Sequence, residues 1–286
     1  MPSQNEVVIP VTPLYPRQLR LDTTSKCQAG CASCHRFITN RRGEMPNDLM
    51  LKIINDVAKW PEPLNEIIPV NYGELFMRKD WLWILQMIES KLPHTRIVIP
   101  TNGAKLDIQT IKDLCGIQTI DIINFSINAF YDETYRAFMK LPVEKLHKLP
   151  DVVKLIKVLR PDIEIRASMV SAPAWCTDYE KDMFQLFWKE QGVEPWILPA
   201  ASADRGVKLL HPVLIPCRSI FSDIVVGFDG NLSSCCFDSG FQAYDLGKYS
   251  GNLLEDWNNE KFKEFRRIHN EHKRFTIPWC KGCTFA

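Results

Sequence analysis

The sequence lacks an apolar run long enough to span a bilayer, and its first sixteen residues lack the apolar core of a secretory signal. It also lacks an excess of one charge, since 35 Lys and Arg residues offset 34 Asp and Glu residues to give a net charge of +1. No global attraction to nucleic acid or to an anionic membrane is therefore expected. Internal repeats and low-complexity tracts are absent as well. These absences predict a cytoplasmic protein that binds neither membrane nor nucleic acid.

Cysteine, in contrast, is abundant, with 10 residues in a chain of 286. In a reducing compartment, grouped cysteines are more often metal ligands than disulfides. Hydrophobic residues make up 45% of the sequence, which at this length is enough for a full core. We therefore expect one large domain, with or without a smaller appendage.

Three cysteines near the N-terminus, Cys27, Cys31 and Cys34, follow a short apolar stretch with the spacing Cys-x3-Cys-x2-Cys. Three thiolates fit three irons of a 4Fe-4S cube and leave the fourth iron free to bind a small molecule. The alternatives are a disulfide between two of them, or structural zinc. Structural zinc needs four ligands at paired spacings, and His35, directly beside Cys34, is poorly placed to be the fourth. The spacing favours the cluster.

The region from residue 18 to residue 199 alternates short β-rich runs with amphipathic stretches, a pattern typical of a parallel α/β sheet. Apolar residues recur at helical spacing within 49–57, 81–88 and 152–159. The predicted strands are 19–22, 67–71, 96–100, 120–126, 163–170 and 195–198. Six strand–helix units are too few to close the usual eightfold barrel. We predict a partial (β/α)6 TIM barrel, open on one side, with its chemistry at the C-terminal ends of the strands.

A second group of cysteines lies in the C-terminal part of the chain. Cys217 is followed by Gly230 and Cys235, and later by Cys280-x-x-Cys283. Four thiols in this arrangement can bind either zinc or a second 4Fe-4S cluster. We therefore predict an N-terminal extension at 1–17, a barrel at 18–205 and a small cluster-binding domain at 206–286.

The grouping of the first three cysteines at a strand-to-loop transition resembles that of the radical S-adenosylmethionine (SAM) superfamily, in which the open iron chelates the amino and carboxylate groups of SAM. Residues 228–238 resemble the hairpin that opens the SPASM and twitch extensions of these enzymes, and residues 246–266 resemble the segment that leads to their later cysteines. The resemblance covers about residues 18–286. Only two cysteines follow Cys236, so the count implies one auxiliary cluster, the twitch arrangement. Its ligands would be Cys217, Cys235, Cys280 and Cys283.

The resemblance also implies SAM contacts at the strand ends. The segment 71–75 is similar to the glycine-glycine-glutamate-proline motif that holds the methionyl amino group, although only Gly73 and Glu74 match. Asn102 lies in a segment that accompanies SAM in the family. Ser126 would bond the ribose, and the backbone around Leu198 would flank the adenine. From the residues alone, the first two sites are equally compatible with turns, and Ser126 with a buried core hydroxyl.

Arg166 takes the place of a basic residue that reaches the methionyl carboxylate in related enzymes. On alternating strand geometry it shares a face with Ser168, and Ser126 shares one with Asn128, so each pair is expected to point into the barrel. An arginine inside a barrel costs too much desolvation to lack an anion partner.

The implied mechanism begins with an electron from a donor such as flavodoxin or ferredoxin. The reduced first cluster then cleaves SAM to a 5′-deoxyadenosyl radical, which removes a hydrogen atom from the substrate. Four ligands complete an electron-accepting auxiliary cluster, so oxidation of the substrate is favoured. The alternative is an epimerase in which a thiol, Cys236 or Cys176, returns a hydrogen atom. A non-enzymatic metal-binding scaffold would explain the cysteines but neither the barrel pattern nor Gly73-Glu74.

The substrate is not determined by the fold. Peptide-modifying relatives often carry an added N-terminal leader-binding domain, and only about seventeen residues precede the first predicted strand. We expect either a small molecule, such as an aminocyclitol or sugar, or a peptide recognised by another chain. Candidates for substrate contact, each of which is alternatively an ordinary surface residue, are His35, Arg36, Trp175, Asp204 and Arg205.

Overall fold

The strands of the computed structural model, which describes residues 12–171, 174–199, 214–281 and 283, build one sheet. They are β1 (Gln18–Leu21), β2 (Glu66–Ile68), β3 (Arg96–Thr101), β4 (Ile120–Ser126), β5 (Glu164–Ser171), β6 (Glu194–Pro199), β7 (Asp223–Val226) and β8 (Leu232–Ser233). Their order is β6-β5-β4-β3-β2-β1-β7-β8. All neighbours are parallel except β7 and β8. β1 to β6 confirm the six predicted strands. Because β6 and β8 are the two edges of this sheet, the barrel is open, as predicted.

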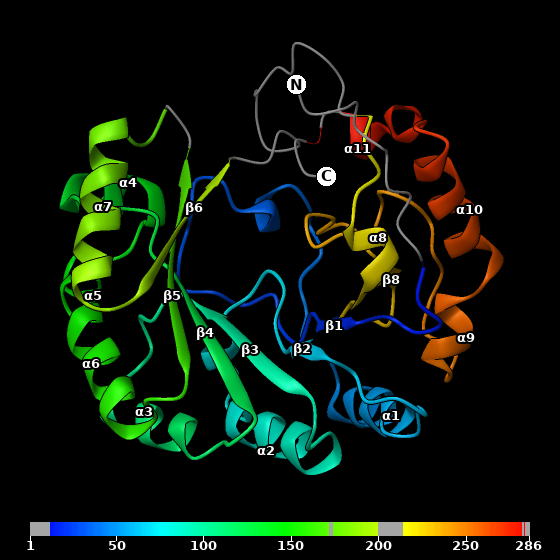
Figure 1. Ribbon diagram of the computed structural model, residues 1–286, viewed down its shortest axis with the longest axis horizontal. Coiled ribbons are helices and arrows are strands. Elements are labelled where there is room, and N and C mark those ends of the chain that lie inside the picture. Colours follow the sequence, from blue (N-terminus) through cyan, green and yellow to red (C-terminus); the bar gives the residue numbers. More distant parts are fainter. Residues whose placement is uncertain (1–11, 172–173, 200–213, 282, 284–286) are drawn as a thin grey trace, which may run out of the picture.

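One strand of the sheet, β7, is not predicted by the sequence analysis. It pairs in parallel with β1, with Leu19 opposite Ile224, and then turns back into β8. The C-terminal part of the chain therefore continues the barrel sheet (Figure 1). The predicted boundary at 205/206 lies outside the described residues.

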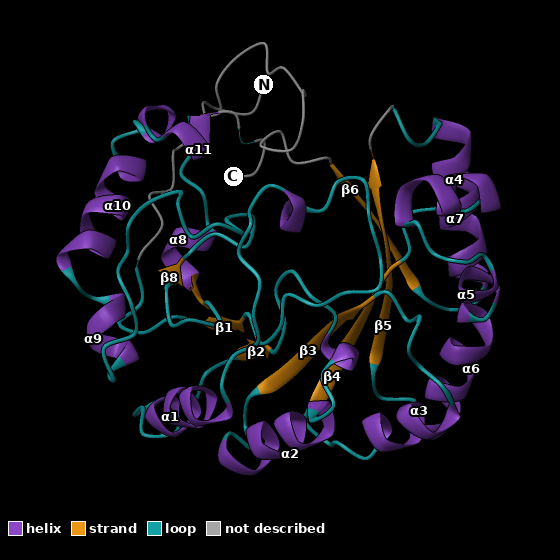
Figure 2. Ribbon diagram, turned by 180° about the vertical axis from the view of Figure 1, so that it is seen from behind, coloured by secondary structure: helices purple, strands orange, loops and turns teal. Residues whose placement is uncertain are grey.

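Helices cover the outer side of the curved sheet (Figures 1 and 2). They are α1 (Asn47–Val57), α2 (Trp81–Lys91), α3 (Ile108–Cys115), α4 (Asp132–Met139), α5 (Glu144–His147), α6 (Leu149–Leu159) and α7 (Asp178–Glu190). The side chains of Asp107 and Thr177 cap α3 and α7 by accepting backbone N–H bonds. The C-terminal part contributes α8 (Ser219–Ser222), α9 (Leu253–Trp257), α10 (Glu260–Asn270) and α11 (Pro278–Lys281). No helix in the described ranges has the length and apolar character needed to cross a membrane.

The two faces of the sheet differ in polarity because side chains alternate along each strand. Positions that face the helices, such as Leu19, Ile97 and Ile123, are fully buried in the main core. The alternate positions face the concave side. There Asn124 of β4 lies beside Arg166 of β5, and Ser126 lies beside Ser168. The structure therefore turns polar side chains toward the inside of the barrel.

Candidate functional site

The loop that carries the first three cysteines runs between β1 and α1 and is fastened to the end of α4. The N–H groups of Gly30 and Ala32 donate to the carbonyls of Met139 and Phe138, at 3.0 and 2.8 Å. Burial raises the pKa of Cys27 to about 11 and that of Cys31 to about 12, and the Cys34 thiol nearby adds to both shifts. None of the cysteines that the structure describes forms a disulfide. The three predicted ligands are thus neighbours on one anchored loop.

Gly73, which follows β2, packs directly against this loop. A Cβ atom at Gly73 would lie 2.0 Å from the carbonyl oxygen of Thr24 and 2.9 Å from that of Lys26. The next residue, Glu74, donates its N–H to the Lys26 carbonyl at 2.8 Å. Only glycine fits this close approach of two backbones, so Gly73 has a steric function that the sequence pattern alone does not establish.

The Glu74 carboxyl group is 2% exposed and is held by the end of β3. One oxygen accepts from the Thr101 hydroxyl at 2.9 Å, and the other accepts from the Asn102 N–H at 2.9 Å. The Asn102 side chain accepts from Gln28 at 2.7 Å, and its amide lies 3.7 Å from the Cys27 sulfur. Burial raises the pKa of Glu74 to about 7, against the lowering effect of these hydrogen bonds. Glu74 and Asn102 are therefore tied to each other and to the cysteine loop.

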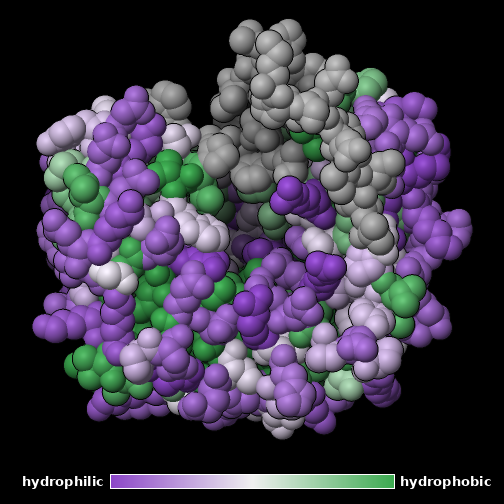
Figure 3. All heavy atoms as spheres, in the orientation of Figure 1, coloured by the Kyte–Doolittle hydropathy of each residue, from purple (hydrophilic) through white to green (hydrophobic). Residues whose placement is uncertain are grey.

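A cavity of about 170 Å³ brings together seven of the nine residues predicted to hold the first cluster and SAM. Its wall includes Cys27, Cys31, Cys34, Gly73, Glu74, Asn102 and Ser126. Tyr72 and Met139 belong to the same wall. The space-filling view from the side of Figure 1 is hollowed near its centre (Figure 3). Residues that are up to 112 positions apart in the sequence thus meet where the parallel strands end.

Other predicted residues lie away from this cavity. Arg166 is in contact with the Glu164 carboxylate, and its guanidinium lies 4.2 Å from the centre of the Trp196 ring. It has the expected anion partner, but that partner belongs to its own strand. Leu198 of β6 lies opposite Val170 of β5 and outside the cavity wall.

The predicted contacts beyond β5 are also separate from the cavity. Trp175 is 40% exposed and meets the Phe138 ring edge-on. The Cys176 thiol is buried and lies 3.8 Å from the Val170 carbonyl oxygen. Asp204 and Arg205 lie outside the described residues.

His35 and Arg36 are engaged within the protein. The His35 ring is 4% exposed, its Nδ1 lies 2.8 Å from the Phe237 carbonyl oxygen, and it stacks on Tyr72 with ring centres 5.8 Å apart. The Arg36 guanidinium donates to the carbonyls of Ser25 and Ala29, at 3.3 and 2.9 Å. His35 thus packs against the C-terminal part of the chain, and Arg36 holds the cysteine loop.

Cys217 interacts electrostatically with each of the other three C-terminal cysteines of the predicted set. Burial raises the pKa of Cys280 to about 12, with further contributions from the thiols of Cys217 and Cys283. Burial and the Cys236 and Cys217 thiols raise the pKa of Cys235 well above its usual range. These mutual effects require the thiols to be close neighbours.

Two buried basic side chains flank this second set, and the sequence analysis does not identify either. Arg274 is 1% exposed and donates to the carbonyls of Ile215 and Cys283, at 2.9 and 3.4 Å. Its charge lowers the pKa of Cys217 and of Cys280, against the larger effect of burial. His269 accepts the Cys217 N–H at 3.2 Å, and burial lowers its pKa to about 4. Because nothing in its spacing marks Arg274, only the fold reveals its position.

Tyr72 and Arg41 join the two cysteine regions. The Tyr72 hydroxyl donates to the carbonyl of Cys236. The Arg41 guanidinium bonds the Asp229 carboxylate at 2.6 Å and lies 4.4 Å from the centre of the Phe241 ring. Tyr72 occupies the position at which the family motif has its first glycine. This departure from the motif is the sequence feature that could have identified Tyr72 as a functional residue.

The donor sets fit iron-sulfur clusters. No three His, Cys, Asp or Glu side chains within the described ranges are placed to hold a single metal ion. A 4Fe-4S cube takes each thiolate on a different iron, so its ligands need not gather around a single ion. Three neighbouring thiols and a separate set of four match such clusters in number and chemistry.

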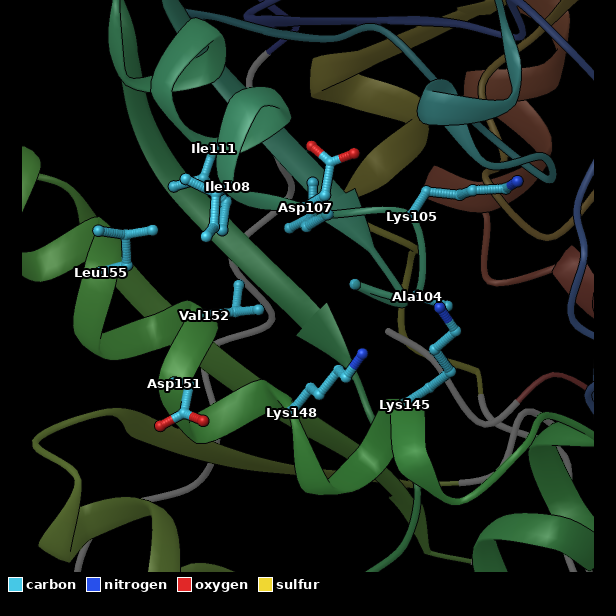
Figure 4. A pocket seen from close by; sticks show the side chains of 12 residues that line it. Ala104, Lys105, Asp107, Ile108, Ile111, Lys145, Lys148, Asp151, Val152 and Leu155 are labelled. Carbon is cyan, nitrogen blue, oxygen red and sulfur yellow. The ribbon is translucent and has the colours of Figure 1, made fainter.

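A larger pocket, of about 630 Å³, lies between α3 and α6 in the helical layer (Figure 4). Ile108, Ile111, Val152 and Leu155 form its apolar wall, and Lys145 and Lys148 lie at one side. It shares no residue with the cavity beside the cysteines. Its size alone does not make it the active site, because none of the predicted chemistry lies there.

Comparison with known proteins identifies the C-terminal part. Residues 217–284 match the SPASM family, an iron-sulfur cluster-binding domain. A protein of Pyrococcus furiosus, the tungsten-containing aldehyde ferredoxin oxidoreductase cofactor-modifying protein, is 28% identical over 113 residues. This match covers 39% of the present chain and 31% of the relative, so it spans less than a third of that protein.

Three solved structures share the fold. BtrN in complex with AdoMet (SAM) and 2-DOIA has a TM-score of 0.65 at 20% identity, and the match covers 96% of this chain and 94% of BtrN. The protein anSMEcpe with bound AdoMet has a TM-score of 0.70 at 14% identity, covering 93% and 88%. SuiB of Streptococcus suis bound to its precursor peptide SuiA has a TM-score of 0.69 at 13% identity, covering 88% and 67%. The chain therefore has the partial-barrel fold of radical SAM enzymes and carries an SPASM iron-sulfur cluster-binding domain at residues 217–284.

Proposed function

We propose that this protein is a radical SAM oxidoreductase that removes two electrons from its substrate. Cys27, Cys31 and Cys34 would hold the first 4Fe-4S cluster. The observation that carries the proposal is the shared cavity, in which these three thiols meet Glu74, Asn102 and Ser126. A non-enzymatic metal scaffold has no use for a buried carboxyl group and a serine beside its thiols, so the cavity supports an enzyme.

Different residues of the cavity wall would contact different parts of SAM. When bound together, the cluster and SAM supply the one-electron cleavage that produces an oxidant for an unactivated C–H bond. Glu74 would accept the ammonium group, and Asn102 would keep the Cys27 side of the loop in place. At about 170 Å³ the cavity holds only part of a nucleotide-sized ligand. The ribose and adenine would extend past Ser126 along the polar concave face.

The second cysteine set supports oxidation rather than a redox-neutral reaction. Cys217, Cys235, Cys280 and Cys283 would complete all four positions of an auxiliary 4Fe-4S cluster and leave none open for substrate. Arg274 places a buried positive charge beside these thiols. A positive charge stabilises the reduced, more negative state of a cluster, so this set is suited to accept an electron.

The substrate class that we propose is a polar small molecule. BtrN binds 2-DOIA, and its match covers nearly the whole of both chains. SuiB binds a peptide, and one third of SuiB lies outside the match. The concave face presents Asn124 and Arg166 on adjacent strands, which suits hydrogen bonding to hydroxyl groups. Trp175, Asp204 and Arg205 remain candidates for substrate contact, and Cys176 remains a candidate hydrogen-atom donor.

The reaction class is tested by incubating the anaerobically reconstituted protein with SAM, dithionite and a panel of aminocyclitols, sugars and peptides. We expect one small molecule of the panel to lose the mass of two hydrogen atoms. The amount of this product should be proportional to the 5′-deoxyadenosine formed. A product of unchanged mass with inverted configuration would reject oxidation.

Epimerisation is the second candidate, and the position of Cys236 favours it. The Cys236 carbonyl accepts from the hydroxyl of Tyr72, which belongs to the wall of the cavity beside the first three cysteines, so Cys236 adjoins a residue of that wall. A hydrogen-atom donor needs such a position. Incorporation of one solvent deuterium at the substrate carbon, lost in a Cys236→Ala variant, would support this alternative.

The pKa of Glu74 leads to a pH prediction. Burial raises it to about 7, so the carboxyl group is neutral below that pH and ionised above it. Since only the ionised form attracts an ammonium group, SAM should bind roughly eightfold more weakly at about pH 6 than at about pH 7.5. The measurement is a calorimetric titration of the cluster-loaded protein with SAM. The Glu74→Gln variant should bind weakly with no such slope, and an equal slope in that variant would contradict the assignment.

The charge of Arg274 leads to a second prediction. Replacing it with glutamine should shift the midpoint potential of the auxiliary cluster to a more negative value, because the reduced cluster loses a buried cation. Potentiometric titration followed by EPR measures this shift. Arg274→Lys, which keeps the charge, should restore most of the potential. Arg267→Gln, a change at an exposed arginine of α10, should leave it unchanged. A lysine variant that behaves like glutamine would show that Arg274 acts through its hydrogen bonds alone.

A further inference from the structure

A second pocket, of about 540 Å³, lies on the outer side of the first cysteine loop. Cys27 belongs to its wall and also to the wall of the inner cavity that contains Glu74 and Ser126. The remaining wall residues are Ser25, Lys26, Arg36, Arg42, Gly43, Glu44 and Met77. One proposed cluster ligand therefore separates the SAM cavity from a depression in the protein surface.

The outer pocket is basic and has apolar side chains nearby. Lys26 has 61% of its side chain exposed, and Arg42 is also exposed. Glu44 is the one acidic residue of the wall, and it already pairs with Lys26 at 3.0 Å. Phe37 and Ile38, which follow the third cysteine closely, are 50% and 43% exposed. Exposed apolar groups beside basic ones suit a transient protein interface with an acidic partner.

We propose that this outer pocket is the docking site of a small acidic one-electron carrier protein. The inference rests on the proposed function, which requires one electron to reach the first cluster. In that step, the reduced carrier loses one electron and the cluster held by Cys27, Cys31 and Cys34 gains it, with no bond made or broken. A protein cannot enter a cavity of about 170 Å³, so the electron must arrive from the surface. The outer pocket is where the surface reaches a ligand of the cluster.

The geometry of Arg36 separates its function from that of the other basic residues. It donates to the carbonyls of Ser25 and Ala29 and lies over the Phe37 ring at 4.7 Å. Its loss would disturb the cysteine loop itself. The Lys26 side chain pairs with Glu44 at 3.0 Å, and the Arg42 guanidinium donates to the carbonyls of Thr39 and Arg41, at 2.9 and 2.7 Å. These bonds are to residues outside the segment 27–34. Lys26 and Arg42 are therefore the pair to change.

The test uses the cluster-loaded protein with Lys26→Gln and Arg42→Gln, and flavodoxin, an acidic flavoprotein, as the probe. The matched control is Lys145→Gln with Lys148→Gln, which removes the same charge from the pocket between α3 and α6 (Figure 4). At low salt, we expect the first pair to weaken flavodoxin binding roughly tenfold and to slow cluster reduction by flavodoxin in proportion. The control pair should change neither quantity, and added salt should weaken wild-type binding.

Reduction by dithionite distinguishes docking from damage, since this small reductant needs no protein interface. Its rate should be equal in wild type and in both variants. The proposal is overturned if the Lys26/Arg42 pair binds flavodoxin as tightly as wild type, if the control pair weakens binding equally, or if dithionite reduction also slows. Failure of the proposed function shows differently: wild-type protein reduced by dithionite would then leave SAM intact, whatever the flavodoxin affinities.

Discussion

Replacing Cys31 with alanine is expected to remove about four of about eight irons per chain and to abolish SAM cleavage. Three thiolates are the whole protein contribution to the first cluster, so the loss of one leaves two irons of the cube without protein ligands. The second set, with Cys217 and Cys280, lies on other elements and should keep its cluster. The measurement is iron and sulfide analysis after anaerobic reconstitution, together with detection of 5′-deoxyadenosine.

The matched control for this substitution is Cys115→Ala. Cys115 is 7% exposed at the end of α3 and belongs to neither set. Its removal should leave the iron content and SAM cleavage unchanged and cost only about 1 kcal/mol of unfolding free energy for a small buried side chain. If Cys31→Ala retained all its iron, or if Cys115→Ala lost half of it, the assignment of the first ligand set would be wrong.

Replacing Gly73 with alanine is the second change with a large expected effect. The added Cβ would lie 2.0 Å from the Thr24 carbonyl oxygen, so the segment after β2 must move away from the cysteine loop. That movement breaks the Glu74 N–H bond to the Lys26 carbonyl and displaces the Glu74 carboxyl group. We expect a loss of about 3 kcal/mol of unfolding free energy and a SAM affinity at least tenfold weaker. Denaturant titration and calorimetry measure the two effects.

Gly30 offers a control on the same loop. A Cβ at Gly30 would meet only the flexible Lys140 side chain, at 3.1 Å or more. Gly30→Ala should therefore keep near wild-type stability and SAM affinity, because Lys140 can move aside. Equal losses in both variants would mean that the loop rejects any change, rather than that Gly73 is required for the contact with Thr24.

The barrel was largely predictable because short β-rich runs alternate with amphipathic stretches of helical period, as in 49–57, 81–88 and 152–159. β7 differs from these strands, because Asp223–Val226 contains only three consecutive apolar residues and lies inside a segment marked by cysteines. A run this short does not distinguish a strand from other buried backbone. Its pairing with β1, more than 200 residues earlier, depends on tertiary contacts that no local pattern contains.

Site residues were predictable where cysteine spacing or a position at a strand end identifies them. They were not predictable where a side chain finds its hydrogen-bond or ion-pair partner only in the folded structure. The first three cysteines, Gly73, Glu74, Asn102 and Ser126 all lie where parallel strands end, and they meet in one cavity. Arg166 forms an ion pair with Glu164, which lies two positions earlier on the same face of the same strand. That pairing was visible in the sequence.

Tyr72, Arg41 and Arg274 could not be found in this way. Tyr72 and Arg41 act across the contact between the barrel and the SPASM region, as when Tyr72 donates to the Cys236 carbonyl, whereas Arg274 bonds carbonyls within the C-terminal part. The partner atoms are often backbone carbonyls, which every residue has, so no residue pattern identifies them. The architecture of this contact is what determines how the two cysteine sets are placed relative to each other.

The most direct test of the central claim is the formation of 5′-deoxyadenosine by the anaerobically reconstituted protein with SAM and dithionite. If three thiols hold an open-iron cluster beside Glu74, wild-type protein should form this product, and the Cys31→Ala protein should form none. A wild-type sample that contains about eight irons and eight sulfides per chain, yet leaves SAM intact under these conditions, would contradict the account.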